Sequence, residues 1–174
     1  MRSSDMHTYP PSCGPESGQL TAFLDHYRAT ILQRADGLDA AQLAQPLAPS
    51  SLTLGGLLNH LAYVEDLWFQ VRFAGNPADP LWAHVDRAAD PDHEFRTAAD
   101  VPPDELRRRY EDACERSRGV VRTTDSLDQR AARPRSNGQY ADLRWILLHM
   151  LEETARHAGH ADLLREAIDG TVGD

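Results

Sequence analysis

Residues 142–170 read DLRWILLHMLEETARHAGHADLLREAIDG, a long helical pattern near the end of the chain. Apolar residues recur at three- and four-residue spacing, which predicts a helix from about Asp142 to Ile168 that stops at Gly170. At 100° per residue, one face of this helix consists of Ile146, His149, Met150, Glu153, His157, His160, Leu164 and Ala167. An otherwise apolar face therefore contains a column of polar side chains.

Three earlier stretches have the same periodicity. They predict a helix from Gln19 to about Ala35 and a second from about Leu54 to Phe73. A third is predicted to begin near Pro102 and Pro103 and to reach about Thr124. The segments between them, 75–101 and 126–140, are interrupted by Pro, Gly and Asp, and we expect irregular loops there. The first of these loops is expected to include a short helix near His93.

Four helices without alternating strand patterns predict an all-α fold, an antiparallel four-helix bundle. The long connection between the second and third helices permits a crossover. Residues 1–17 are rich in Pro, Ser and Gly, and we expect a frayed tail there. Residues 18–170 are expected to form a single domain.

Composition limits the classes of partner. Asp and Glu outnumber basic residues 27 to 18, the net charge is −9, and the acidic residues are scattered, which argues against nucleic acid as a partner. No stretch resembles a signal peptide or reaches the roughly 18 apolar residues of a membrane span, so a cytoplasmic protein with no membrane partner is expected. Two cysteines are too few for a disulfide framework, and Cys114 is expected to be a buried free thiol.

The polar column on the fourth helix has one counterpart on another helix. On the second helix, Thr53, Leu57, His60, Val64, Leu67 and Val71 share a face on which His60 is the central polar residue. Glu153 and His157 are four residues apart, so their donor atoms lie on adjacent turns of one face. Imidazole and carboxylate donors of this kind bind Zn, Ni, Fe or Mn, and we expect His60, Glu153 and His157 to bind one divalent metal ion.

Each of these residues also has a purely structural interpretation. His60 by itself is compatible with a hydrogen-bonded core histidine, and Glu153 with His157 is compatible with a buried ion pair. His149 and His160 are compatible with roles as hydrogen-bond partners of the ligands, proton carriers or alternate ligands. The aromatic residues that could line a pocket are Trp68, Phe69, Trp82, Tyr140 and Trp145.

Two stretches together resemble a known family. Residues 49–69, PSSLTLGGLLNHLAYVEDLWF, and residues 143–170 closely resemble the DinB-like superfamily, specifically its actinobacterial mini-circle branch. The resemblance extends from Leu20 to Gly170. It implies a four-helix bundle in up-down-down-up order and a metal triad at His60, Glu153 and His157. Many relatives have His at both positions of the last helix, whereas a His, Glu, His set is similar to that of the mycothiol-dependent maleylpyruvate isomerases.

The resemblance further implies thiol-dependent chemistry on small electrophiles. A low-molecular-weight thiol such as mycothiol would be deprotonated at the metal and would attack the electrophile, giving an S-transferase or an isomerase. In such an enzyme His149 or His160 could relay protons, and Arg144 and Trp145 could contact the cosubstrate or an anionic substrate. An exposed surface role for Arg144 is an equally good interpretation. Relatives also commonly form homodimers.

Two other functions use the same metal site. Metal-bound water in place of a thiol would make the protein a hydrolase. A protein that binds metal without turnover, in a stress response, is the non-enzymatic alternative.

Overall fold

The computed structural model describes residues 9–173, and all regular structure in that range is helical. The elements are α1 (Glu16–Arg34), α2 (Ala40–Leu43), α3 (Leu54–Glu65), η1 (Asp66–Phe73), α4 (His93–Thr97), η2 (Ala98–Asp100), α5 (Pro103–Arg122) and α6 (Leu143–Asp169). Within the same range the strand-like pairing is limited to one isolated bridge between Arg130 and Asp142. The prediction of an all-α fold is confirmed.

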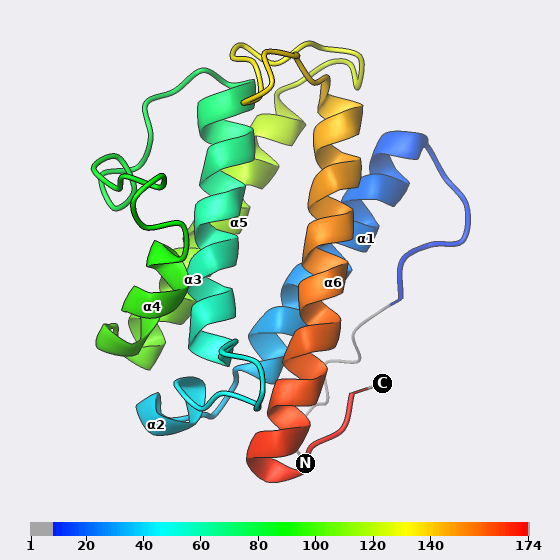
Figure 1. The fold of residues 1–174 in the computed structure, drawn as a ribbon. Helices are drawn as coiled ribbons and strands as arrows, with labels where there is room; N and C mark the ends of the chain where they lie inside the picture. The colour runs from blue at the N-terminus through cyan, green and yellow to red at the C-terminus, as the bar shows by residue number, and fades with distance from the viewer. Residues whose placement is uncertain (1–8, 174) are drawn as a thin grey trace.

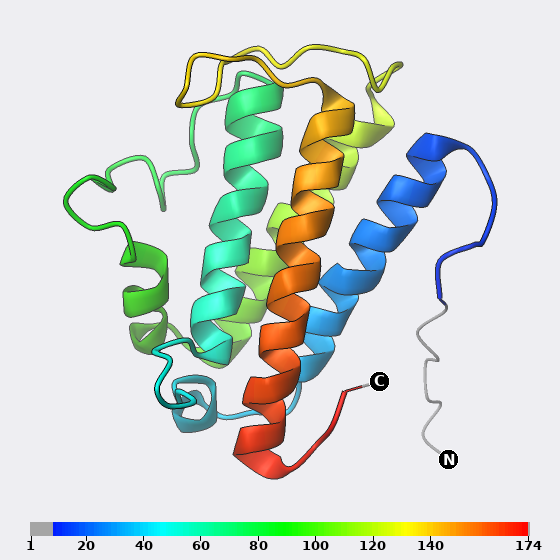
Figure 2. The same cartoon turned by 45° about the vertical axis from the view of Figure 1, so that its right-hand side comes forward.

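The four long helical segments lie side by side (Figures 1 and 2). In Figure 1, α1 and α6 run downward, whereas α3 continued by η1, and α5, run upward. The α1 helix packs mainly against α6, and α3 mainly against α5. The short α4 helix packs beside α3, in the connection between η1 and α5. No helix of residues 9–173 is long and apolar enough to cross a membrane.

Most predicted helix limits lie within three residues of the observed ones. The α1 helix begins at Glu16, three residues before the predicted start, so it overlaps the predicted tail. Residues 1–8 of that tail prediction lie outside the described range. The α4 helix, His93–Thr97, is the short helix expected near His93. The α2 helix is an addition that apolar periodicity does not predict, because its four residues depend on a capping box between Asp39 and Gln42.

The α6 helix has the expected ends but a different buried face. The Asp142 side chain accepts a 2.8 Å hydrogen bond from the backbone N–H of Trp145, and Gly170 ends the helix with φ of 78°. The buried positions are Leu143, Ile146, Leu147, Met150, Thr154, His157, Ala158, Ala161 and Leu164. Ala167, predicted to be buried, is exposed, and Glu153 is only partly buried. The polar column therefore lies along the edge of the core face, where water can reach it.

The second long segment is not a uniform α-helix as predicted. From Asp66 to Phe73 it is a π-helix, in which the backbone N–H of Ala74 bonds to the carbonyl of Phe69, five residues back. Each π turn takes up more residues than an α turn, so the buried face shifts along the sequence. Phe69 and Phe73 are buried, whereas Leu67 and Val71, predicted to face the core, are half-exposed.

A buried ion pair links α1 to α3 beneath this transition. The Arg28 guanidinium donates to both carboxylate oxygens of Glu65, at 2.7 and 2.6 Å, and both residues are almost fully buried. The Cys114 thiol lies 3.9 Å from the same carboxylate and is buried and free, as predicted. Burial raises the pKa of Cys114, with the Glu65 charge adding to the effect. Sequence periodicity missed this pair because it treats each charged position as solvent-facing.

We predict that Glu65→Gln destabilises the protein by about 3 kcal/mol, because the buried Arg28 then keeps only the exposed Asp25 as a counter-charge. Urea unfolding followed by circular dichroism measures this loss. Glu115→Gln, which removes an exposed partner of Arg118 and Arg122, is the matched control and should leave the free energy of unfolding nearly unchanged. Equal effects of the two changes would contradict the importance of the buried pair.

Candidate metal centre

His60 of α3 and Glu153 and His157 of α6 meet at one point. The Oε1 atom of Glu153 lies 3.2 Å from Nε2 of His60 and 3.3 Å from Nε2 of His157. One donor atom from each side chain lies within 4.8 Å of the other two. The convergence that helical spacing predicts is therefore present, with the two imidazoles on either side of one carboxylate oxygen.

These distances suit a metal ion. Two ligand atoms that each lie about 2.1 Å from a tetrahedral ion are about 3.4 Å apart. The distances from the Glu153 oxygen to the His60 and His157 nitrogen atoms, 3.2 and 3.3 Å, are close to this value. The side chains retain 15%, 16% and 11% of their exposure at His60, Glu153 and His157, so small molecules can reach the point. The same distances also fit ion pairs between the carboxylate and protonated imidazoles, and the metal content of the protein distinguishes the two interpretations.

A second carboxylate lies behind His60, and sequence reasoning missed it. The buried Glu94 side chain, from α4, lies 3.0 Å from Nδ1 of His60, and its other oxygen accepts a hydrogen bond from Arg87. A carboxylate on the far nitrogen of an imidazole orients the ring and selects the tautomer that leaves Nε2 available. This contact supports a ligand role for His60. The sequence offered only the position of Glu94 directly after His93, and nothing in it indicated that Glu94 is buried.

The approach of α4 to α3 depends on Gly56, one turn before His60. A Cβ at Gly56 would lie 2.9 Å from Oγ1 of Thr53 and 3.2 Å from a ring carbon of Phe95. With glycine there, the Phe95 ring stacks on the His60 ring, with centroids 4.4 Å apart and planes 22° apart. Glu94 and Phe95 together therefore fix the orientation of the His60 imidazole.

The charges of the cluster are strongly coupled. Hydrogen bonds from His157 and His60 hold the pKa of Glu153 far below its usual range, against the opposing effect of burial. Burial disfavours a charged His60, but its bonds with Glu153 and Glu94 outweigh burial and raise its pKa. An anionic oxygen between two imidazoles attracts either a proton or a metal cation, and a bound cation would displace the His60 proton.

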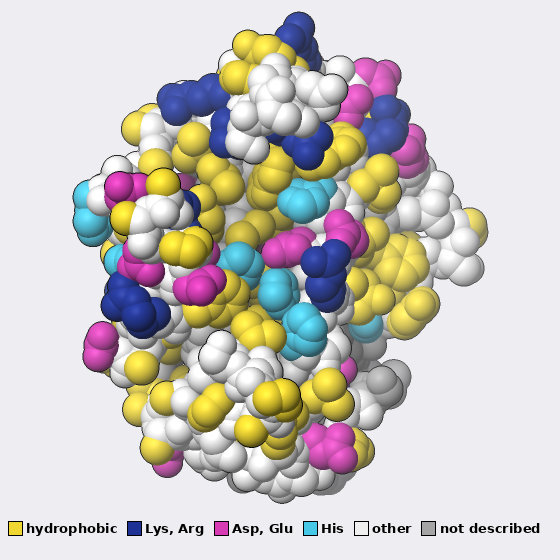
Figure 3. Space-filling model, in the orientation of Figure 1, with side chains coloured by type: hydrophobic (Ala, Val, Ile, Leu, Met, Phe, Trp, Pro, Cys, Tyr) yellow, Lys and Arg dark blue, Asp and Glu magenta, His cyan; other side chains and the backbone are white. Residues whose placement is uncertain are grey.

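The two further histidines lie on either side of the triad along α6. Nδ1 of His160 lies 3.3 Å from Nδ1 of His157, on the side of His157 away from Glu153. His149 stacks on the Trp145 ring with centroids 5.0 Å apart and contacts Trp68 edge-on at 4.7 Å. Burial lowers the pKa of His149, and the positive charges of Arg135 and Arg156 act in the same direction. Figure 3 shows the His side chains gathered along the middle of one face, with hydrophobic side chains beside them.

The remaining predicted site residues divide into two groups. Trp68 and Trp145 flank His149, with ring centroids 5.2 Å apart. Phe69 is buried in the core, Trp82 packs against Tyr63, and Tyr140 stacks with Arg130. Arg144, predicted to meet an anionic group, forms ion pairs with Glu16 and Asp128 instead. Its charge is thus already balanced by two carboxylates.

Comparison with known proteins decides the family. Residues 19–170 match the family model described as mycothiol-S-transferase. The chain belongs to the mycothiol-S-transferase family. This membership confirms the predicted DinB-like resemblance, while the mini-circle branch stays a prediction. No curated protein sequence matches the chain.

At least two solved structures resemble the fold. One is a conserved protein from Enterococcus faecalis, with a TM-score of 0.69 and 17% identity over 91% of this chain and 100% of that one. The other is a mycothiol-dependent maleylpyruvate isomerase, with a TM-score of 0.62 and 16% identity over 83% of this chain. This chain spans only 60% of the isomerase. At these identities the likeness concerns the fold alone.

For this family member we predict that His60→Ala and Glu153→Gln each lose most of the bound metal, because each removes one of three protein donors. Elemental analysis of the purified protein measures the metal content. Glu152→Gln, an exposed neighbour on α6, is the control and should keep its metal. Full metal content in both triad variants would reject the site and leave the ion-pair interpretation.

A separate prediction concerns Glu94. Glu94→Gln should weaken metal binding by about 10- to 100-fold without abolishing it, because the change loosens the His60 ring but removes no donor. Competition with a chromophoric chelator measures the affinity. Asp92→Asn, an exposed carboxylate of the same connection, is the matched control. An unchanged affinity in Glu94→Gln would show that the carboxylate behind His60 has no part in binding.

Proposed function

We propose that this protein is a metal-dependent S-transferase that joins the thiol of mycothiol to a small electrophile. The observation that supports this best is the convergence of His60 Nε2, Glu153 Oε1 and His157 Nε2 on one partly accessible point. Membership of the mycothiol-S-transferase family supports the thiol. An isomerase that uses the same thiol as a recycled cosubstrate would need the same site.

The proposal includes the fold, which we infer to be a DinB-like four-helix bundle. The helix directions in Figure 1, with α1 and α6 opposed to α3 and α5, accord with up-down-down-up order. This order brings the second and last long helices together on one face, where each contributes to the triad. Use of mycothiol also accords with the cytoplasmic location expected from the sequence, and the homodimer expected from the family resemblance remains part of the proposal.

In this site His60, Glu153 and His157 would hold the metal ion. A divalent ion there supplies positive charge that deprotonates a coordinating thiol near neutral pH. Three protein donors leave at least one position for the thiol. Two neutral imidazoles and one carboxylate leave a net positive charge at the site, which stabilises an anionic sulfur. A ligand set of two imidazoles and one carboxylate, without a cysteine thiolate, is compatible with Zn, Ni, Fe or Mn.

The residues around the triad have complementary tasks. His149 is neutral at pH 7, because burial lowers its pKa, and a neutral imidazole one turn from Glu153 can accept the thiol proton. His160 contacts Nδ1 of His157 and would hold that ring in place or pass a proton to solvent. The rings of Trp68 and Trp145 form an apolar wall beside His149. Trp145 would pack against the thiol cosubstrate or the electrophile and exclude water.

The direct test measures loss of mycothiol thiol in the presence of iodoacetamide and metal-loaded protein. We expect protein-dependent thioether formation that falls by about 100-fold or more in His60→Ala and Glu153→Gln, because the charge that stabilises the thiolate is lost. Mass spectrometry identifies the product. Glu166→Gln, an exposed carboxylate near the end of α6, is the control, and N-acetylcysteine in place of mycothiol measures selectivity for the cosubstrate.

Other outcomes point to the alternative functions. Triad-dependent cleavage of a nitrophenyl ester without thiol consumption would replace the transferase with a hydrolase. Retained metal with neither activity would favour a non-enzymatic metal-binding protein.

A further inference from the structure

Within residues 9–173, four arginines have no carboxylate close enough to form an ion pair. Arg72, Arg130, Arg133 and Arg135 form no ion pair with a carboxylate, whereas every other arginine in residues 9–173 has a carboxylate oxygen within 4.0 Å. The net charge of the chain is −9, so carboxylates are abundant. Four arginines without a carboxylate partner therefore give this part of the protein a local excess of positive charge.

Backbone contacts bring Arg72 next to the segment that contains the other three arginines. The segment that follows α5 is bonded to the end of η1, since the backbone N–H groups of Ala132 and Arg133 donate to the carbonyls of Phe73 and Arg72. The Arg72 and Arg133 side chains also donate to backbone carbonyls, of Pro134 and Gly75. The Arg130 guanidinium lies over the Tyr140 ring. Figure 3 shows basic side chains across the upper end of the face that displays the histidines.

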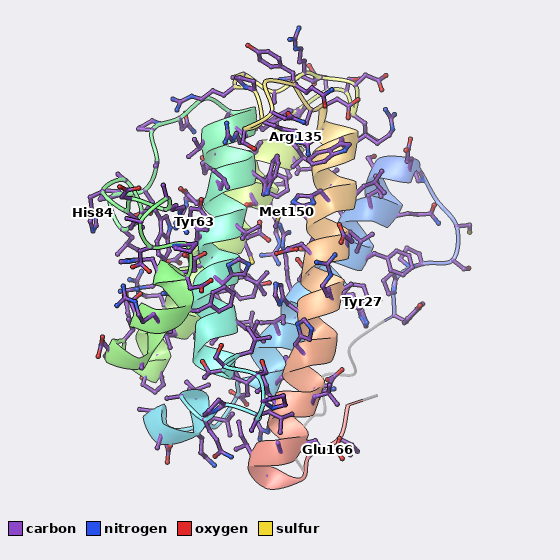
Figure 4. All side chains as sticks on the ribbon, in the orientation of Figure 1. Tyr27, Tyr63, His84, Arg135, Met150 and Glu166 are labelled. Carbon is purple, nitrogen blue, oxygen red and sulfur yellow. The ribbon has the colours of Figure 1, made fainter. Side chains whose placement is uncertain are left out.

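Arg135 is linked to the metal triad through two aromatic contacts. Its guanidinium carbon lies 4.2 Å from the centre of the Trp145 ring, and the same ring stacks with His149. His149 is one helical turn from Glu153, so Trp145 stands about 12 Å from Glu153 along the α6 axis. Figure 4 places Arg135 between the upper ends of η1 and α6, beneath the connection from α5.

The Arg135 side chain is held in place but keeps its hydrogen-bonding capacity. A tight turn, closed by bonds from Arg135 N–H to the Gln139 carbonyl and from Gly138 N–H to the Arg135 carbonyl, fixes its backbone. Gly138 has φ of 79°, which favours glycine. The aromatic contact leaves the N–H donors at the guanidinium edge, and no hydrogen bond in the described residues uses them. Those donors match the two oxygens of a carboxylate.

We propose that Arg135, with Arg72 and Arg133 adding positive charge nearby, binds a carboxylate on the electrophilic substrate while the reacting carbon of that substrate lies at the triad. The inference rests on the proposed S-transferase function and narrows its substrate class to small carboxylic acids that carry an electrophilic carbon. The Trp145 and Trp68 rings would contact the apolar stem between the two ends. Arg135 is thus a specificity-determining residue.

The test uses a matched pair of electrophiles, the iodoacetyl derivative of aminocaproic acid and the same derivative of its primary amide. In each reaction the mycothiol sulfur forms a C–S bond, the C–I bond breaks, iodide leaves with its electron pair, and the thiol proton goes to solvent. The protein carries Cys13→Ser, because Cys13 is exposed and would consume the reagent, whereas Cys114 is buried. We expect kcat/KM to favour the carboxylate about tenfold, the ratio that one charge-assisted hydrogen bond supplies.

Arg135→Met should lower kcat/KM for the carboxylate to that of the amide, because the carboxylate loses its charged hydrogen-bond partner. Arg135→Lys should restore part of the preference, because it keeps the charge without the fork geometry. Arg122→Met, an exposed arginine paired with Glu115, is the matched control and should keep the full preference. Thermal unfolding checks that each variant is folded.

A binding measurement that needs no turnover separates the two proposals. The unreactive acetyl derivatives of aminocaproic acid and its amide are titrated into protein, and NMR follows the indole N–H of Trp145. Tighter binding of the carboxylate that is lost in Arg135→Met supports the subsite, even if no thiol transfer occurs and the proposed function fails. Thiol transfer without any preference for the carboxylate, together with equal binding of the two compounds, would overturn the subsite and leave the transferase intact.

Discussion

The Glu153 carboxylate, held between the imidazoles of His60 and His157, is the interaction on which the rest of the site depends. A single carboxylate oxygen about 3.2 Å from two nitrogen atoms has to be compensated by a proton or a cation. It requires α3 and α6 to lie side by side, and it requires both imidazoles to turn the same nitrogen inward. Glu94, Phe95 and His160 meet that second requirement from behind the rings. The centre is therefore assembled from three separate segments of the chain.

The fold supports this centre while leaving it accessible. The apolar face of α6 is buried, but the polar column runs along its edge, so the ligand atoms are reachable from solvent. The π-helix at Asp66–Phe73 changes which residues face the core and places Trp68 beside Trp145 and His149. Such irregular turns are frequent at functional sites. Here the largely buried α3 helix ends at Glu65, and the π-helix that follows carries Trp68, whose ring contacts His149 at the edge of the site.

Charge is distributed unevenly around the same site. Most arginines are balanced by nearby carboxylates, including Arg28, whose buried pair with Glu65 links α1 to α3. The arginines near the connection from α5 to α6 are held by aromatic rings and backbone carbonyls instead. Arg135 has no carboxylate partner and lies against Trp145, so this part of the surface is suited to small anions with an apolar portion. In the proposed function, a cation-binding triad and an anion-attracting cluster would lie close together.

Sequence periodicity alone determined that the chain is helical, and it identified His60, Glu153 and His157, because residues four apart on a helix share a face and polar side chains on an apolar stripe stand out. It could not place Glu94, since a short helix in a long connection has no periodicity to read. Sequence reasoning also named Arg144 for an anionic group, because its pairing with Glu16 and Asp128 depends on residues distant in sequence. The π-helix, the buried Arg28–Glu65 pair and the charge excess at Arg135 were decided only by tertiary packing, which sets which carboxylate each charge meets.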